Sequence, residues 1–530
     1  MDGTGNPWFK ADIAVSNGKI VQIGDLSQES AERFIDAEGQ VVAPGFIDIH
    51  THSDFSLLVN PKAESMIRQG VTTLVIGNCG HTPYPVNEET KEDLKRIIIG
   101  YMPEVEIDWV SLDGYMKRLD AQGVSVNVVP LVGHGSLRVA VMGFASRLPT
   151  DDELGEMKRL LERELKDGAF GFSTGLEYPP GFYSNTEELI ELCKVVAKYG
   201  RLYATHIRDR GEGMIAATKE AIKIGELTGV PVHISHHVPR YPFEDKADEV
   251  LALIDEARMK GLDVTCDALI PFVLEDKLPE YMFAPGILVA MLPEWAFEGG
   301  VEKLLERLRD EETRREIRIK NTKAQARLAL DGQWHRIFIT HSDAHPEFNG
   351  KSIQEIAKAQ NKDPWDVVFD LILAEGPNCY NIHTAGAAYT LKDGIKVLKH
   401  PTAAPESDGL ALATYGPLKD LTFGMGSYGY IPYFFEKYVR ERKLFTVEEA
   451  VRKCTSLPAQ RLNIRDRGLL REEMWADIVI FNPNHIRCRA TFSQPNQYPE
   501  GIDYVIVNGE VVVERGEHTG ALSGKPLRAK

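Results

Sequence analysis

Hydrophobic and polar residues alternate one by one near both ends of the chain. Near the start, alternating runs at 11–15 and 19–23 flank Ser16-Asn17-Gly18, and Asn-Gly between two such runs indicates a β-hairpin. Similar strand-like runs recur near the far end, at 477–481, 505–507 and 511–513. Because an isolated hairpin is marginally stable in water, we expect both ends to join in one small β domain. Two unrelated terminal hairpins are the alternative.

In the middle of the chain, short apolar runs alternate with amphipathic stretches of helical period. The apolar runs, which we interpret as strands, are 46–49, 72–76, 126–131, 169–173, 202–205, 230–234 and 262–266. The amphipathic stretches between them include 152–166, 186–199 and 213–227. Strands and helices in alternation predict a parallel sheet with helices outside. Seven units before residue 270 favour a (β/α)8 TIM-like barrel over an open doubly wound sheet.

The regular alternation stops after residue 270. A charge-rich stretch at 301–330 is typical of a solvated helical insertion. Residues 337–340 and 364–373 then predict a further strand and helix, and Glu406-Ser407-Asp408-Gly409 is expected to end the last barrel strand. The predicted fold class is therefore α/β, a (β/α)8 TIM-like barrel with a small β-sandwich built from both chain ends. Its predicted parts are residues 1–42 (N-terminal part of the sandwich), 43–454 (barrel, with a helical insertion around 275–400) and 455–530 (C-terminal part of the sandwich).

Composition narrows the classes of function. A net charge of −17 argues against a nucleic-acid partner, which favours a basic surface. The chain contains no run of about 18 apolar residues, so the sequence predicts no membrane-spanning helix. The first residues lack the features of a signal peptide. The six cysteines are scattered and form no disulfide framework. We expect a cytoplasmic protein that acts on a small molecule; the oligomeric state is left open.

Candidate chemistry lies where the predicted strands end, because a (β/α)8 barrel gathers functional side chains at that face. His50 and His52 follow the first strand and, two residues apart, point the same way. Other strand ends supply Cys79, His134, His206, His236 and Asp408. Thiolate and imidazole groups converging from separate strands predict a zinc site at the barrel mouth. Taken singly, each has a structural alternative, such as a buried cysteine or a solvated or core histidine.

Such a set of residues suits metal-assisted hydrolysis. Zinc lowers the pKa of a bound water to about 7 and polarises a carbonyl oxygen. Amide hydrolysis also needs a proton shuttle, since the amine leaves poorly unless it is protonated. Asp408 is the candidate general base and then acid; the alternative is a solvated turn residue.

Several longer motifs carry a resemblance to a known family. They are PGFIDIHTHSDF from Pro44, GVTTLVIGNCG from Gly70, STGLEYPP from Ser173, YATHIRDRGEG from Tyr203, PVHISHH from Pro231 and ESDGL from Glu406. With these motifs the chain resembles the D-aminoacylase (N-acyl-D-amino-acid deacylase) family of the amidohydrolase superfamily. The resemblance implies the barrel and sandwich described above and hydrolysis of a linear amide, N-acyl-D-amino acids being the default substrates.

The resemblance also implies roles for individual residues. Cys79 occupies the place where many relatives use a carboxylated lysine to bridge metals. With His206 and His236 it would hold one tight zinc, while His50 and His52 would form a second, weaker site. Asp408 matches the catalytic aspartate.

Two departures from the family pattern concern the substrate. Val238 stands where the family usually has a lysine, and residues 423–429 lack the arginine that helps to hold a substrate carboxylate. Candidates to replace them are Arg208, Arg240 and His345, and weaker substrate-side candidates are Tyr178 and His134. A tyrosine capping a proline turn and a core histidine are the structural alternatives for the last two.

These departures keep alternative functions open. A cyclic amide of the hydantoin or dihydropyrimidine type, or a dipeptide, is the second candidate substrate on the same scaffold. A non-catalytic binding relative is the third hypothesis, although no expected metal ligand is missing.

Overall fold

A closed parallel barrel forms the centre of the computed structural model, which describes residues 1–97, 102 and 104–530. Eight parallel strands follow one another around it: β4 (Phe46–Asp48), β5 (Val71–Ile76), β6 (Asn127–Gly133), β7 (Gly171–Gly175), β8 (Leu202–His206), β9 (Val232–Ile234), β10 (Val264–Leu269) and β15 (Ala403–Glu406). The first and last strands meet beyond their ends, where the backbone N–H of His52 donates to the carbonyl of Gly409 at 2.9 Å. The predicted (β/α)8 barrel is confirmed.

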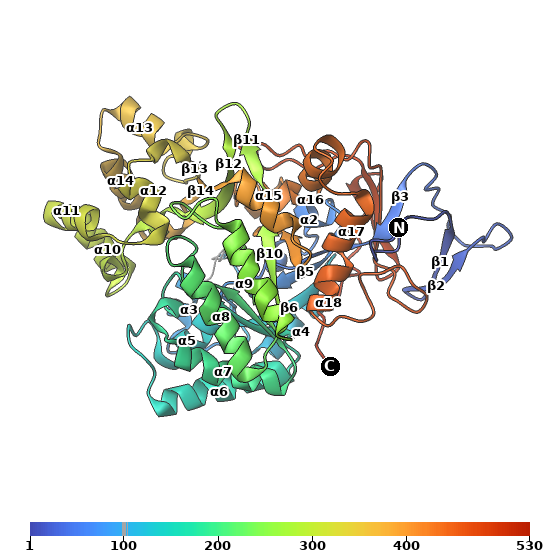
Figure 1. Ribbon diagram of the computed structural model, residues 1–530, viewed down its shortest axis with the longest axis horizontal. Helices are drawn as coiled ribbons and strands as arrows, with labels where there is room; N and C mark the ends of the chain where they lie inside the picture. Colours follow the sequence, from blue (N-terminus) through green and yellow to red (C-terminus); the bar gives the residue numbers. More distant parts are fainter. Residues whose placement is uncertain (98–101, 103) are drawn as a thin grey trace.

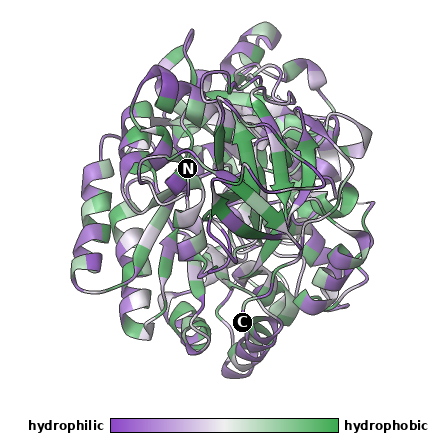
Figure 2. Cartoon of the chain, turned by 90° about the vertical axis from the view of Figure 1, so that its right-hand side faces the viewer, coloured by the Kyte–Doolittle hydropathy of each residue, from purple (hydrophilic) through white to green (hydrophobic). Residues whose placement is uncertain are grey.

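Helices cover the outside of the barrel because each has one apolar face. They include α4 (Leu112–Gln122), α5 (His134–Met142), α6 (Asp151–Lys166), α7 (Thr186–Lys198), α8 (Met214–Thr228), α9 (Ala247–Met259), α15 (Leu391–Lys399), α17 (Val447–Cys454) and α18 (Ser456–Arg461). Helix α6 starts with a capping box between Thr150 and Glu153 and buries Met157, Leu161 and Leu165 against the barrel. Figure 2 shows the result as apolar strands inside and mixed, two-faced helices outside.

A large insertion separates β10 from β15. It contains an antiparallel sheet in the order β11 (Phe272–Leu274), β12 (Leu278–Ile287), β14 (His383–Thr390) and β13 (Ile337–His341). Five α-helices accompany this sheet in the described chain: α10 (Val301–Leu308), α11 (Glu311–Lys320), α12 (Arg327–Leu330), α13 (Ile353–Gln360) and α14 (Pro364–Glu375). The sequence predicts a helical insertion here with one strand at 337–340, which is β13; the other three strands of the sheet were not predicted. The sheet has a weak signal because β14 contains Gly386 and three alanines rather than alternating branched residues.

The small β domain combines both ends of the chain. Its antiparallel sheet contains β3 (Val41–Pro44), β16 (Ile478–Phe481), β17 (Ile502–Val507), β18 (Glu510–Glu514) and β19 (Glu517–His518). The hairpin β1 (Asp12–Ser16) and β2 (Lys19–Gly24) covers it through a shared apolar layer that includes Ile20, Ile478 and Ile480. The predicted union of the two ends is confirmed, and Figure 1 shows this hairpin at the opposite end of the molecule from the insertion.

The remaining α-helices of the described chain are short: α1 (Ser56–Val59), α2 (Glu64–Ile67), α3 (Lys91–Ile97) and α16 (Gly426–Tyr433). None of the helices in the described ranges has the length and apolar character needed to cross a membrane.

Candidate metal centre

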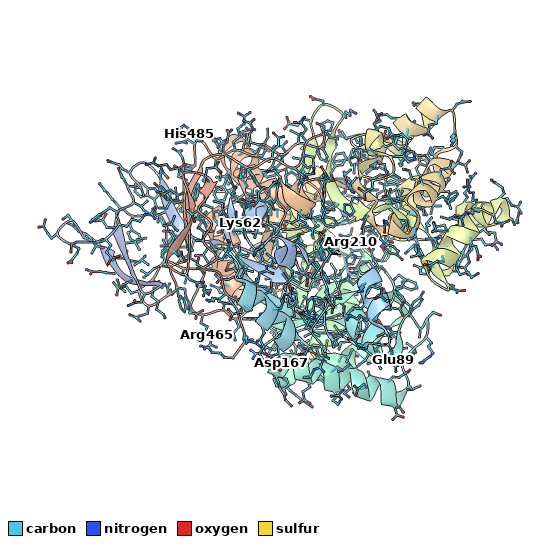
Figure 3. All side chains as sticks on the ribbon, turned by 180° about the vertical axis from the view of Figure 1, so that it is seen from behind. Lys62, Glu89, Asp167, Arg210, Arg465 and His485 are labelled. Carbon is cyan, nitrogen blue, oxygen red and sulfur yellow. The ribbon has the colours of Figure 1, made fainter. Side chains whose placement is uncertain are left out.

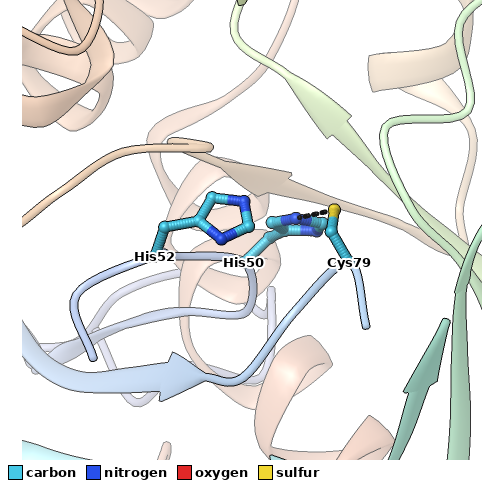
Figure 4. Close-up of side chains that lie close together, drawn as sticks. All are labelled: His50, His52 and Cys79. Atoms are coloured by element: carbon cyan, nitrogen blue, oxygen red, sulfur yellow. Dashed lines mark hydrogen bonds between the residues drawn. The ribbon is translucent and has the colours of Figure 1, made fainter. Parts of the chain in front are cut away.

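Five candidate metal ligands meet at the C-terminal mouth of the barrel. The Sγ atom of Cys79 lies 3.3 Å from Nε2 of His50, 3.7 Å from Nδ1 of His206 and 3.6 Å from Nε2 of His236. Cys79 therefore belongs to two groups of three whose donor atoms all lie within 4.8 Å of one another, one with His50 and His52 and one with His206 and His236. Figure 4 shows the first group, with His50 turned toward the thiol.

The backbone at three of these positions adopts the left-handed conformation. The φ angle is 54° at Cys79, 35° at His236 and 46° at Asp408. Residues other than glycine rarely adopt such angles, and each costs roughly 1–3 kcal/mol. The three residues come from different strand ends, so the fold holds strained backbone at the rim of the barrel and turns their side chains into one space.

Two buried carboxylates orient the histidines from behind. Oε2 of Glu177 lies 2.8 Å from Nε2 of His206, and Oδ2 of Asp267 lies 3.4 Å from Nδ1 of His50. In each ring the other nitrogen faces Cys79. Carboxylates in this position fix the tautomer and angle of a metal-binding histidine. Asp267 also accepts hydrogen bonds from His233 and from the backbone N–H of His236.

Glu177 is itself enclosed by donors from two parts of the fold. Arg240 donates to both of its carboxylate oxygens, and Gln325 of the insertion donates at 2.9 Å. These contacts hold the pKa of Glu177 well below its usual range: burial acts in the opposite direction, but the charges of Arg240 and His206 and a hydrogen bond from His206 outweigh it. The insertion therefore contacts the carboxylate that orients one candidate zinc ligand.

Asp408 faces the second group of ligands. Its Oδ1 atom lies 3.1 Å from Nε2 of His52 and 3.7 Å from Nε2 of His50. Burial by itself raises the pKa of Asp408, but the hydrogen bond from His52 and the charges of both histidines prevail and lower it. The group is thus an ionised carboxylate, the form needed to accept a proton.

The electrostatics also favour metal binding at the shared cysteine. Burial opposes ionisation of Cys79, yet the charge of His50 and hydrogen bonds from His206, His236 and His50 lower its pKa well below the usual value. Burial, followed by the charge of Arg210, lowers the pKa of His236 to about 4. A thiolate and a neutral imidazole are the forms in which these side chains bind metal.

Two other predicted residues, Tyr178 and His134, have different surroundings. The hydroxyl of Tyr178 donates to the carbonyl of Cys79 at 3.0 Å, and its ring packs edge-on against His206. His134 is buried at the start of α5 and lies 2.7 Å from Glu188, which also pairs with Arg138. Tyr178 therefore lies beside the candidate metal ligands, whereas His134 is paired with Glu188.

The candidates proposed to replace the missing lysine and arginine are already paired. Arg208 donates through Nε and Nη2 to Glu220 on α8, each at 3.0 Å. His345 lies in the insertion 2.9 Å from Glu347. Arg240 is occupied by Glu177.

Sequence reasoning missed Glu177, Asp267, Arg210 and Gln325. Asp267 lies within β10, near the end of a strand that the sequence predicts, so a search of the strand ends could have found it. Glu177 immediately precedes Tyr178, the residue that the sequence indicated after β7. Gln325 has no local signal, since only the fold of the insertion brings it to Glu177.

The donor set fits zinc. Two ligands of one tetrahedral zinc, with Zn–S near 2.3 Å and Zn–N near 2.1 Å, lie about 3.6 Å apart. The distances from Sγ of Cys79 to the imidazole nitrogens of His206 and His236 are 3.7 and 3.6 Å. A sulfur and nitrogen ligand set is typical of zinc rather than magnesium or calcium.

Comparison with known proteins agrees with this geometry. A model described as "Amidohydrolase family" matches residues 33–513. The chain belongs to the amidohydrolase family. It is 34% identical to the D-aminoacylase of Alcaligenes xylosoxydans xylosoxydans, over 99% of this chain and 95% of that protein. The predicted family is thereby confirmed.

Two solved structures of amidohydrolases extend the comparison. An N-acyl-D-glutamate deacylase from Bordetella bronchiseptica, described as complexed with zinc and a phosphonate mimic of the tetrahedral intermediate, has a TM-score of 0.80 and 31% identity, covering 100% of this chain and 97% of its own. A D-aminoacylase structure, described as having a binuclear metal centre with one-metal activation and second-metal attenuation, has a TM-score of 0.79 and 31% identity, covering 99% and 97%. The expected zinc cofactor, with a second metal position, agrees with these relatives.

Proposed function

We propose that this protein is a zinc-dependent hydrolase that removes the acyl group from N-acyl-D-amino acids. The observation that carries the proposal is the pair of ligand groups that share Cys79, with Asp408 beside them. Similarity to a D-aminoacylase and to an N-acyl-D-glutamate deacylase over nearly the full chain supports the substrate class.

Within the site, we assign separate roles to the two groups of ligands. Cys79, His206 and His236 would hold the tighter zinc, because carboxylate and backbone contacts orient both of these histidines. His50 and His52 would hold a weaker ion together with Cys79.

We assign the steps of hydrolysis to bound zinc and to residues of the chain. Bound zinc supplies a Lewis acid that polarises the amide carbonyl and lowers the pKa of water. Asp408 accepts the proton of the attacking water at its carboxylate and returns it to the amide nitrogen, so that the amine leaves neutral. Tyr178, His134 and Arg208 stay candidates for the substrate side, with Tyr178 favoured by its contact with Cys79. A small-molecule substrate and a reducing, cytoplasmic location complete the proposal, and the six free thiols support such a compartment.

A substrate screen combined with metal analysis tests the proposal. N-acetyl- and N-formyl-D-amino acids are compared with their L-enantiomers, with hydantoins and dihydropyrimidines, and with dipeptides. We expect the D-acyl compounds to be hydrolysed and zinc to copurify, and we expect Cys79→Ala to lose both zinc and activity. Faster turnover of cyclic amides or of dipeptides would contradict the substrate class, and an active zinc-free Cys79→Ala variant would contradict the role of the metal.

A further inference from the structure

Arg210 is a buried cation that the chemistry described so far does not use. It follows β8 by four residues, is 8% exposed, and lies toward the middle of the molecule in Figure 3. Its Nη1 atom lies 3.1 Å from Nδ1 of His236, and its guanidinium faces the ring of Tyr389 on β14 of the insertion, 5.6 Å from the ring centre. One imidazole ring separates the guanidinium from the thiol of Cys79.

The positive charge of Arg210 is only partly compensated. Nη2 of Arg210 lies 3.8 Å from Oε2 of Glu177, a long ion pair, and Glu177 already accepts hydrogen bonds from Arg240, His206 and Gln325. Asp209 lies 4.0 Å from Arg240 and accepts hydrogen bonds from backbone N–H groups of its own loop. Nε of Arg210 is buried without a hydrogen-bond partner among the described residues. A buried cation with spare donors is costly unless an anion completes it.

The contact between Arg210 and His236 also favours a bound anion. A neutral histidine that binds metal through Nε2 carries its proton on Nδ1, where it becomes a donor. A guanidinium has donors and no acceptor. With metal on His236, the two groups that now lie 3.1 Å apart would both be donors, and an anionic oxygen beside them would accept from both.

We propose that Arg210 receives the carboxylate of the substrate in place of the lysine and arginine that this chain lacks. This inference rests on the proposed function. The carboxylate carbon of an N-acyl amino acid lies three bonds from the attacked carbonyl carbon, about 3 to 4 Å away. Nη1 of Arg210 lies 3.1 Å from Nδ1 of His236, while Nε2 of the same ring faces Cys79, so a carboxylate bound to Arg210 would lie beside this imidazole. Arginine binds carboxylates through two parallel hydrogen bonds, which gives both strength and orientation.

The neighbouring side chains support this choice among the arginines. Val238 is fully buried and offers no charge, Arg208 is held by Glu220, and Arg240 is held by Glu177. Of these three arginines, Arg210 is the one that makes no hydrogen bond to a carboxylate among the described residues, and Tyr389 of the insertion faces its guanidinium. The substrate class that follows is an acylated amino acid with a free carboxylate rather than its amide or ester.

The test compares two substrates in matched variants. The N-acyl-D-amino acid that the wild type turns over fastest is assayed beside the same compound with its carboxylate replaced by a primary amide. For Arg210→Met we expect kcat/KM for the free acid to fall roughly 10- to 100-fold, mainly through KM, with little change for the amide. Arg201→Met removes the same charge at the opposite end of β8, and its acid-to-amide ratio should equal that of the wild type. Arg208→Met tests the other arginine of the loop that follows β8.

Controls separate substrate binding from a structural role. Zinc content and Tm of Arg210→Met are measured, and Arg210→Lys should recover part of the selectivity. An equal loss for acid and amide, or a lowered ratio in Arg208→Met alone, would overturn the proposal.

Calorimetric titration of the free D-amino acid into the zinc-loaded protein gives a readout without turnover. Arg210→Met should weaken this binding. Binding through Arg210 by a wild type that hydrolyses no N-acyl-D-amino acid would reject the proposed function and keep this inference. Hydrolysis of N-acyl-D-amino acids with an unchanged acid-to-amide ratio in Arg210→Met would keep the proposed function and reject this inference.

Discussion

Glu177 accepts a hydrogen bond from Nε2 of His206 at 2.8 Å, which leaves Nδ1 of the same ring facing the thiol of Cys79. The carboxylate thus sets which nitrogen of His206 is free for a metal. Because Glu177 is also held by Arg240 and Gln325, the orientation of this candidate zinc ligand depends on contacts from outside the candidate ligand set.

Replacement of Glu177 by glutamine should weaken zinc binding. Glutamine keeps the size of the side chain but is a poorer acceptor, so we expect zinc affinity to fall roughly 10- to 100-fold. Competition with a chromogenic chelator measures the change. The matched control is Glu162→Gln, whose carboxylate pairs with Tyr199 and Lys166 on the helical surface. Unchanged affinity in Glu177→Gln would show that His206 needs no orienting carboxylate.

Replacement of Asp408 by asparagine should separate catalysis from metal binding. The amide has nearly the same shape but cannot accept the proton from water, so we expect kcat to fall by about 10²- to 10⁴-fold. The tighter zinc should stay, because Asp408 contacts His50 and His52 rather than His206 or His236. Zinc content by mass spectrometry and steady-state kinetics provide the two readouts. Loss of the tight zinc along with activity would assign Asp408 to the ligand set instead.

The metal-free protein should react with iodoacetamide at Cys79 over a wide pH range. The pKa of Cys79 lies well below its usual value, whereas burial raises the pKa of each of the other five cysteines, for example to about 12 at Cys266, Cys379 and Cys488. A lowered pKa keeps the thiolate populated as pH falls, so the labelling rate should vary little between about pH 6 and 8. An ordinary thiol would lose about tenfold per pH unit below its pKa near 8.5.

Peptide mapping after alkylation identifies the labelled cysteine. Zinc should protect Cys79, and a Cys79→Ser protein should take up no label at neutral pH. A rate that falls tenfold per pH unit would contradict the lowered pKa.

Removal of the buried charge of Arg138 should destabilise the fold. Arg138 and Glu188 are both almost fully buried, and Nη1 of Arg138 lies 2.7 and 2.6 Å from the two oxygens of Glu188. Arg138→Met leaves Glu188 and His134 without this partner, at a cost of roughly 3–5 kcal/mol. Differential scanning calorimetry should show a lower Tm, and Arg138→Met combined with Glu188→Gln should recover part of it. An unchanged Tm would mean that His134 alone compensates the carboxylate.

Local patterns in the sequence predicted the barrel and the candidate metal ligands that the structure brings together. His50 and His52 share a face because a strand repeats every two residues, and the remaining ligands follow recognisable strand ends. The left-handed backbone at Cys79, between Gly77 and Gly80, is consistent with the glycine-rich turn seen there.

The supporting contacts could not be predicted in the same way. Glu177 and His206 are 29 residues apart, and Glu177 and Gln325 are 148 apart, so their contacts depend on how distant segments pack. In the sheet of the insertion, β13 was predicted from its branched and aromatic residues, whereas the alanines and glycine of β14 lack the side chains that mark strands. What the sequence conveyed poorly was therefore the environment of the site rather than its ligands.

The pairing of β3 with β16 has a consequence for synthesis. Ala43 lies beside Val479, and β3 leads through Gly45 directly into β4 (Phe46–Asp48), which is followed by His50 and His52. At translation rates of about 5–20 residues per second, more than 400 residues separate the two partners by roughly 20 seconds to over a minute. During that interval the strand that leads to the metal ligands has an open edge on the ribosome. The sheet that contains β3 is therefore completed only after the C-terminal strands have been synthesised.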